Sequence, residues 1–248
     1  MPRLGLAIMA FVLGGVLPKG ERQTAPAVTR TACDSAHVGA GVSGDLDREA
    51  HAAFALLGGR VLRWPWAEPR TLGLWVQRRS AENATHRAAR TPAHSSDPLD
   101  QPAAAADDRA WASAVVAGAL DWRSADVGLA LAVTEDSAAA HLRVLRTPLG
   151  AAGAQRSGVV ADTAGRIEAA WIRLGEADLV GRPYRLRDVR AAAAHEVGHA
   201  LGLTHRAAAG SIMTADVRAD TVSASDRALL RVWYAHPAGR VCVDAARR

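Results

Sequence analysis

The apolar positions along the chain predict alternating helices and strands between residues 46 and 236. Trp111, Val115, Ala119 and Trp122 recur at helical spacing behind an acidic first turn, which predicts a helix over residues 107–122. By the same reasoning we expect further helices over residues 46–57, 186–201 and 223–234. Aliphatic and aromatic runs bounded by turn residues predict strands over residues 61–64, 72–76, 129–133, 141–145, 158–161 and 169–174.

The N-terminus differs from this pattern. An apolar run from Leu4 to Leu17 follows Arg3 and is too short to span a bilayer comfortably. It predicts a signal peptide over residues 1–27 and a secreted, periplasmic or cell-envelope protein, although an uncleaved leader stays open.

The remaining chain divides by composition. Residues 79–107 are poor in bulky apolar side chains and rich in Ala, Ser, Pro and Asp, which predicts a long mobile loop. We expect an N-terminal segment (28–57), a main domain (58–236) that contains this loop, and a C-terminal tail (237–248).

The densest group of chemically active residues lies on the predicted helix 186–201. His195 and His199 are four residues apart, so a helix presents both imidazoles on one face to a single metal ion. Glu196 lies beside them and can hold a metal-bound water without being a ligand. Its carboxylate is the candidate catalytic group.

The residues after this helix complete the group. Gly202 lets the backbone leave the helix at an angle that other residues resist, and the chain then delivers His205 as a third ligand. Structural zinc sites are closed by four protein ligands, whereas catalytic sites keep one position open. Three histidines therefore predict one catalytic Zn²⁺.

A methionine follows the histidines at short distance. Met213, within Ser211-Ile212-Met213-Thr214, is the only methionine outside the leader. Together with H-E-x-x-H-x-x-G-x-x-H over residues 195–205, it resembles the metzincin zinc endopeptidases, and the spacing from His205 to Met213 resembles the matrixin branch. The resemblance covers residues 58–236.

This resemblance implies an α+β fold of the metzincin, zincin-like kind. Its sheet is mixed, twisted and mostly parallel with an antiparallel edge strand, an active-site helix carries the zinc motif, and a small C-terminal subdomain follows. By the same likeness, Asp226 would brace the methionine turn through backbone amides. Residues Gly158, Val159, Val160 and Ala161 would form the edge strand lining the substrate cleft, although an ordinary edge strand is an equal alternative.

Some positions depart from the matrixin pattern. Arg206 stands where typical matrixins have serine, and Ala215 where proline usually follows the methionine turn. No His and Asp cluster lies between residues 146 and 171, so structural zinc or calcium is not implied. His141 is expected to face solvent from its strand, and His51 receives no role.

Charge and cysteine content bear on partners and compartment. The formal net charge of +5 comes almost wholly from scattered arginines, so we expect no nucleic-acid partner. Cys33 and Cys242 are the only cysteines, and export favours a disulfide between them. A lipid-modified Cys33, or a Cys33 that caps the zinc, stays open as an alternative.

These features together predict a monomeric zinc-dependent endopeptidase acting on protein or peptide substrates, with no transmembrane span beyond an uncleaved leader. Two alternatives to this prediction remain. The first is a catalytically silent binding module on a metzincin scaffold, and the second is a zinc hydrolase of non-peptide substrates. Retention of Glu196 argues against the first, because a purely structural site has no use for that carboxylate.

Overall fold

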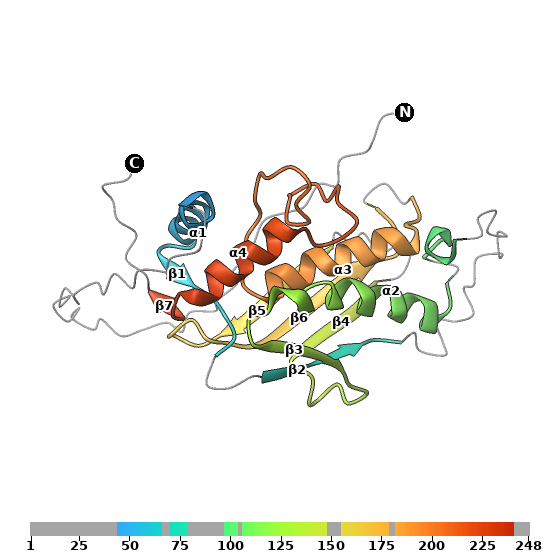
Figure 1. Ribbon diagram of the computed structural model, residues 1–248. Coiled ribbons are helices and arrows are strands. Elements are labelled where there is room, and N and C mark those ends of the chain that lie inside the picture. Colours follow the sequence, from blue (N-terminus) through green and yellow to red (C-terminus); the bar gives the residue numbers. More distant parts are fainter. Residues whose placement is uncertain are drawn as a thin grey trace, which may run out of the picture.

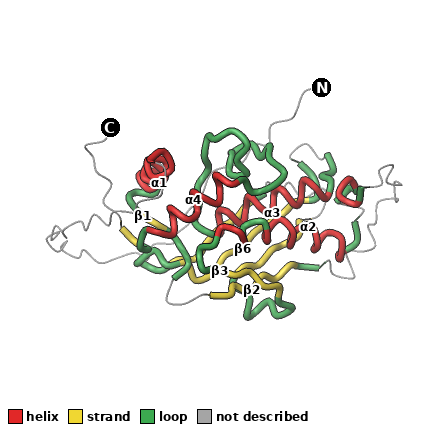
Figure 2. The backbone as a smooth tube through the Cα atoms, in the orientation of Figure 1, coloured by secondary structure: helices red, strands yellow, loops and turns green. Residues whose placement is uncertain are grey.

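A five-stranded twisted sheet with helices on one face forms the body of the molecule (Figures 1 and 2). The computed structural model describes residues 44–65, 70–78, 97–103, 106–147, 155–178 and 182–240. The sheet order is β3-β2-β4-β6-β5, with β2, β3, β4 and β6 parallel and β5 antiparallel at one edge. The protein therefore has the mostly parallel α+β sheet with an antiparallel edge strand that the family resemblance implied.

The strands of this sheet alternate buried and more exposed positions. Their bounds are β2 (Arg70–Val76), β3 (Leu129–Val133), β4 (Leu142–Thr147), β5 (Arg156–Ala161) and β6 (Ile167–Gly175). In β6, Ile172 and Leu174 are fully buried, while Trp171 and Arg173, which alternate with them, are exposed. Period-two alternation of this kind marks a sheet with one face in the core.

Helices α2 (Asp108–Leu120) and α3 (Leu186–Ala200) cover the buried face and pack closely on each other. The contact uses small residues. A Cβ on Gly118 of α2 would lie 2.2 Å from the carbonyl oxygen of Arg190 in α3. The absence of a side chain at this glycine therefore sets the distance between the two helices.

Helices α1 (Gly44–Leu56) and α4 (Ala224–Ala235) pack on each other beside this layer. Below them β1 (Arg60–Val61) pairs with β7 (Gly239–Arg240), so the two ends of the described chain meet. Short 3-10 helices occupy Pro98–Asp100 and Arg123–Ala125. No helix in the described ranges combines the length and apolar content that a membrane span requires.

The predicted helices and most strands are confirmed within a few residues, but two expectations were wrong. Residues 61–64 do not form a strand of the main sheet. Only Arg60 and Val61 pair, with β7, and Arg63 makes an isolated bridge to Arg166. The backbone of Leu62 and Trp64 is instead bound by side chains of α4: the Leu62 carbonyl accepts from the Trp233 indole, and the Trp64 amide donates to the Tyr234 hydroxyl.

His141 is the second correction, because it does not simply face solvent. It directly precedes β4, is half-buried, and its Nδ1 accepts a hydrogen bond from the Gly73 amide at 3.1 Å. Burial, helped by the charge of Arg70, lowers the pKa of His141. The imidazole therefore serves as a neutral acceptor beside strand β2.

Other expectations fall on residues that the structure does not describe. These are the leader over 1–27, both cysteines, most of the tail, and residues 79–96 of the expected mobile loop.

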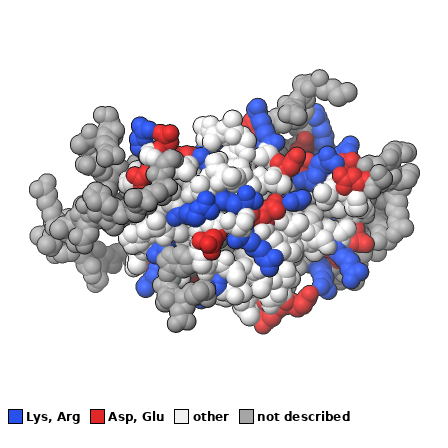
Figure 3. Space-filling model, in the orientation of Figure 1, with Lys and Arg blue, Asp and Glu red and all other residues white. Residues whose placement is uncertain are grey.

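Charged side chains are interspersed on the surface. On the face shown in Figure 3, arginines and acidic residues lie among one another across the described part of the chain. Mixed charge of this kind is typical of a solvated protein surface.

The close contact of α2 and α3 gives a test of the packing. Gly118→Ala should lower the free energy of unfolding by about 1–3 kcal/mol, because backbone atoms of α3 cannot rotate away from the added carbon. Urea unfolding followed by tryptophan fluorescence measures the change. The matched control is Gly44→Ala in α1, where a Cβ meets nothing within 4 Å. An equal midpoint of urea unfolding for both variants would contradict this account of the contact between α2 and α3.

Candidate metal centre

Helix α3 and the loop after it bring three histidines together. The Nε2 atoms of His195 and His199 lie 3.0 Å apart, and those of His195 and His205 lie 3.3 Å apart. His195 is almost completely buried and His199 is partly buried. Three ring nitrogens that converge in this way form a group that could hold a metal ion.

Backbone carbonyls orient the first two rings. Nδ1 of His195 lies 2.7 Å from the carbonyl oxygen of Ile212, and Nδ1 of His199 lies 2.8 Å from that of Leu203. A carbonyl only accepts, so these contacts assign the ring proton to Nδ1 and the lone pair to Nε2. The lone pairs therefore face one another at the point where the nitrogens converge, which fits a shared cation.

Burial keeps the rings neutral. It lowers the pKa of His195 to about 4 and that of His199 to about 3, and it also lowers the pKa of His205. Carbonyl contacts partly oppose the first two shifts, and the neighbouring histidines add to them. Neutral imidazole is the form that binds a metal, so at neutral pH no proton has to leave first.

Glu196 lies on the same helix and is 2% exposed. Burial raises the pKa of Glu196 to about 7, against a hydrogen bond from the Ser157 hydroxyl that lowers it. A bound dication would also oppose the rise. Ser157 was not among the sequence candidates; it lies in β5, one residue before the predicted Gly158–Ala161 segment.

Side chains from distant segments hold the end of α3, where helical carbonyls lack partners within the helix. The Trp64 indole donates to the carbonyl of Ala200 at 2.9 Å, and the Tyr234 hydroxyl donates to that of Leu201 at 3.0 Å. Gly202 then takes φ +102°, and a Cβ there would lie 2.0 Å from the Leu62 carbonyl oxygen. Both backbone conformation and space therefore require glycine where the chain turns toward His205.

Met213 lies against the last turn of the same helix. A Cβ on Gly198 would come within 2.3 Å of the Met213 sulfur and 2.8 Å of the Trp122 ring. The Trp122 indole also donates to the Ala194 carbonyl at 2.8 Å. Gly198, an unspecified position of the motif, thus makes room for the methionine.

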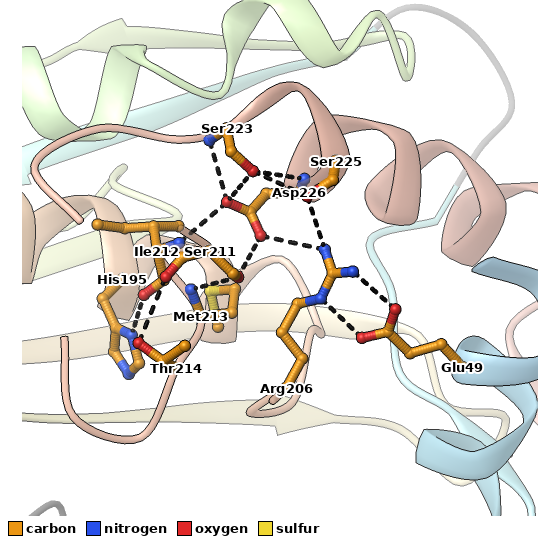
Figure 4. A network of polar contacts seen from close by, with 10 residues as sticks. All are labelled: Glu49, His195, Arg206, Ser211, Ile212, Met213, Thr214, Ser223, Ser225 and Asp226. Carbon is orange, nitrogen blue, oxygen red and sulfur yellow. Dashed lines mark hydrogen bonds and ion pairs between the residues drawn. The ribbon is translucent and has the colours of Figure 1, made fainter. Parts of the chain in front are cut away.

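Asp226 binds the turn that carries Met213 (Figure 4). Its carboxylate accepts from the Ile212 amide at 3.0 Å and from the Ser211 hydroxyl, and it also accepts from Ser223 at the start of α4. Burial alone would raise the pKa of Asp226, but these hydrogen bonds outweigh it and lower the pKa below its usual value. The carboxylate therefore stays charged although the residue is fully buried.

Arg206 supplies the opposite charge (Figure 4). Its guanidinium reaches Asp226 at 3.2 Å and binds both carboxylate oxygens of Glu49 in α1, at 2.6 and 2.7 Å. The side chain of Arg206 is 5% exposed. A continuous path of polar contacts thus runs from Glu49 through Arg206 and Asp226 to the backbone that binds His195.

The sequence candidates therefore occupy one region, with exceptions. His195, Glu196, His199, Gly202, His205, Met213 and Asp226 all belong to α3, the loop after it and α4. The segment Gly158–Ala161 lies in the edge strand β5, which packs against α3. Cys33 and Cys242 lie outside the described residues.

Sequence reasoning missed Ser157, Glu49 and the role of Arg206. The departure of Arg206 from the matrixin pattern was the available signal for the last. Nothing in the sequence alone paired it with Glu49.

The fold and the three convergent histidines fit a metallopeptidase, and a comparison with known families supports this class. Residues 82–234, more than half of the chain, match the family model for matrixin, a peptidase family. The chain belongs to the matrixin family.

Comparisons with individual proteins add little. Two solved structures of myroilysin resemble the chain at 14% identity. One has a TM-score of 0.40 and covers 71% of this chain and 97% of its own. The other has a TM-score of 0.39 and covers 75% and 95%. A search of curated proteins gives no match.

The buried path through Arg206 can be tested by removing its cation. Arg206→Ala should lower the free energy of unfolding by about 3 kcal/mol, because Asp226 then keeps a buried charge without its partner. Arg218→Ala is the matched control, since Arg218 pairs with Asp216 at an exposed site, where ion pairs contribute about 0–1 kcal/mol. Chemical unfolding of both variants gives the comparison. An equal loss of unfolding free energy in the two variants would show that the buried ion pair stabilises the fold no more than an exposed one.

Proposed function

We propose that this matrixin is a zinc-dependent endopeptidase in which His195, His199 and His205 hold the metal. The observation that carries the proposal is the convergence of three Nε2 atoms, with the lone pairs of two fixed by carbonyls at their Nδ1 atoms. Zinc, when bound, would supply a Lewis acid for the substrate carbonyl and lower the pKa of a coordinated water to about 7.

Glu196 is the proposed general base. It would accept the proton of the attacking water and pass it to the leaving amine of the peptide. Its place on α3 next to His195 would put the carboxylate beside a water bound at the three histidines. Ser157 would hold the carboxylate in place through its hydroxyl.

The edge strand β5 is the proposed platform for the substrate. It pairs with β6 on one side, and among the described strands it has no neighbour on the other. An extended peptide could therefore add to this edge through main-chain hydrogen bonds along Gly158, Val159, Val160 and Ala161. This would align a peptide beside α3, which packs against β5.

The rest of the sequence interpretation also belongs to the proposal. Met213 would pack against the helix that carries the ligands, and Asp226 would hold the turn that contains Met213. Gly202 would let the chain turn so that His205 reaches the metal. Residues 1–27 would direct the chain out of the cytoplasm. A Cys33–Cys242 disulfide could persist in the oxidising compartment outside. The domain over 58–236 would act as a monomer. The silent binding module and the non-peptide hydrolase remain the alternatives.

Glu196→Gln separates the enzyme from the binding module. The variant should keep its zinc and fold but lose peptide hydrolysis by about a hundredfold or more, because it cannot accept the proton. Cleavage of a peptide library with blocked termini, analysed by mass spectrometry, measures activity and shows whether cuts are internal. Glu168→Gln, an exposed glutamate of β6, is the control and should match the wild type.

If the zinc-loaded wild type cleaves nothing in that library, the chain is not an endopeptidase. Hydrolysis of ester or amide substrates that lack a peptide backbone would then favour the non-peptide hydrolase. Unchanged activity in Glu196→Gln would exclude this glutamate as the base.

A further inference from the structure

A second group of metal-binding side chains lies between α1 and the end of α4. Asp47 and His51 occupy positions i and i+4 of α1, so they share one face of the helix. His236 follows the last residue of α4. One ligand atom from each of the three residues lies within 4.8 Å of the others. None of the three belongs to the histidine group on α3.

We propose that Asp47, His51 and His236 form a second metal site, for zinc or a similar transition-metal ion, that joins α1 to the C-terminal end of α4. The ligands would be Oδ1 of Asp47, Nε2 of His236 and a ring nitrogen of His51. Nδ1 of His51 lies 2.8 Å from the carbonyl oxygen of Asp47, so binding through Nδ1 would replace that hydrogen bond. Two imidazoles and a carboxylate are a common ligand set for zinc.

The distances are close to those of a bound site. Asp47 Oδ1 lies 3.5 Å from Nδ1 of His51 and 3.9 Å from Nε2 of His236. Ligands that each bind zinc at about 2.0–2.2 Å stand roughly 3.3–3.6 Å apart in a tetrahedron. A shift of a few tenths of an ångström would therefore bring Asp47 and His236 to a shared ion, and His51 would join them through Nδ1 only by giving up its contact with the Asp47 carbonyl.

Two of these atoms are buried without hydrogen bonds. His236 is 5% exposed, and neither its Nε2 nor Oδ1 of Asp47 has a hydrogen-bond partner among the described residues. Buried polar atoms are normally satisfied, so two unsatisfied atoms facing each other at 3.9 Å indicate a missing shared partner.

The surroundings of this group are partly apolar. The ring centroid of Phe54 lies 5.7 Å from that of His51 and 5.0 Å from that of His236, so an aromatic ring contacts both imidazoles. The positive charge of Arg63 acts on His236, so we expect weaker binding here than at the histidines of α3.

Occupancy of this site would fix the position of α1. Glu49, which binds Arg206 beside His205, lies on α1 between Asp47 and His51. The metal would thus hold α1, the helix whose Glu49 contacts Arg206 next to His205. The proposal does not depend on peptidase activity.

The test is zinc stoichiometry in the full chain after equilibrium dialysis against buffered zinc. Wild type should bind about two zinc ions per chain, whereas Asp47→Asn and His51→Gln should each bind about one. Asp45→Asn is the matched control, because Asp45 lies on the same turn of α1, is exposed and pairs with Arg48. It should bind as the wild type does.

The two sites can be separated by a second background. His199→Ala should retain about one zinc, which the added Asp47→Asn change removes. A competing chelator should also strip the α1 site first, and the melting temperature should fall at that step in wild type but not in His51→Gln. The proposal is overturned if His199→Ala binds no zinc, or if Asp47→Asn and His51→Gln bind as much as Asp45→Asn. Far-ultraviolet circular dichroism identifies a variant that fails to fold. If Asp47→Asn does not fold, the zinc content of His51→Gln decides the test, because His51 is half-exposed and its replacement disturbs the core least.

Discussion

The buried carboxylate of Asp226 makes the contacts on which the candidate metal centre depends. It binds the backbone of the methionine turn, caps the start of α4 and pairs with Arg206. The methionine turn also presents the Ile212 carbonyl to Nδ1 of His195. A charge in a fully buried position is costly unless every acceptor site is used, and here hydrogen bonds from both sides satisfy it. Removing any one donor therefore affects elements that do not touch each other directly.

The end of α3 obeys a second constraint of the same kind. A helix that ends in the core leaves carbonyl groups that need donors, and Trp64 and Tyr234 provide them from segments far apart in the sequence. Because these donors sit on a strand-like segment and on α4, the ligand helix cannot end correctly before both have packed. The position of His205, just beyond this end, follows from long-range packing as much as from the local motif.

Much of the fold was predictable because its elements have strong periodic patterns. The helix over residues 107–122 and the strands of the sheet have clear apolar spacing, and α4 has a reciprocal cap at Ser223 and Asp226. The convergence of the three histidines was predictable because its geometry is local to one helix and one turn.

The failures arose where long-range contacts override local pattern. Leu62 and Trp64 alternate like strand residues, but hydrogen bonds with Trp233 and Tyr234 occupy their backbone groups. His141 gained its partner from β2, and Arg206 gained Glu49 from a helix that the sequence placed outside the domain. The cluster of Asp47, His51 and His236 likewise exists only after α1 and α4 meet.

The small side chains of α3 have a consequence for the entropy of the site. Residues 191–194 are four consecutive buried alanines, and α2 meets this helix through Gly118. Alanine and glycine have no side-chain rotamers to lose on folding and none to exchange afterwards. The helix that carries the candidate ligands therefore meets α2 through a surface with few rotamers of its own. A larger side chain on this surface has no neighbouring rotamer to change there, so it would have to move α2 and α3 apart.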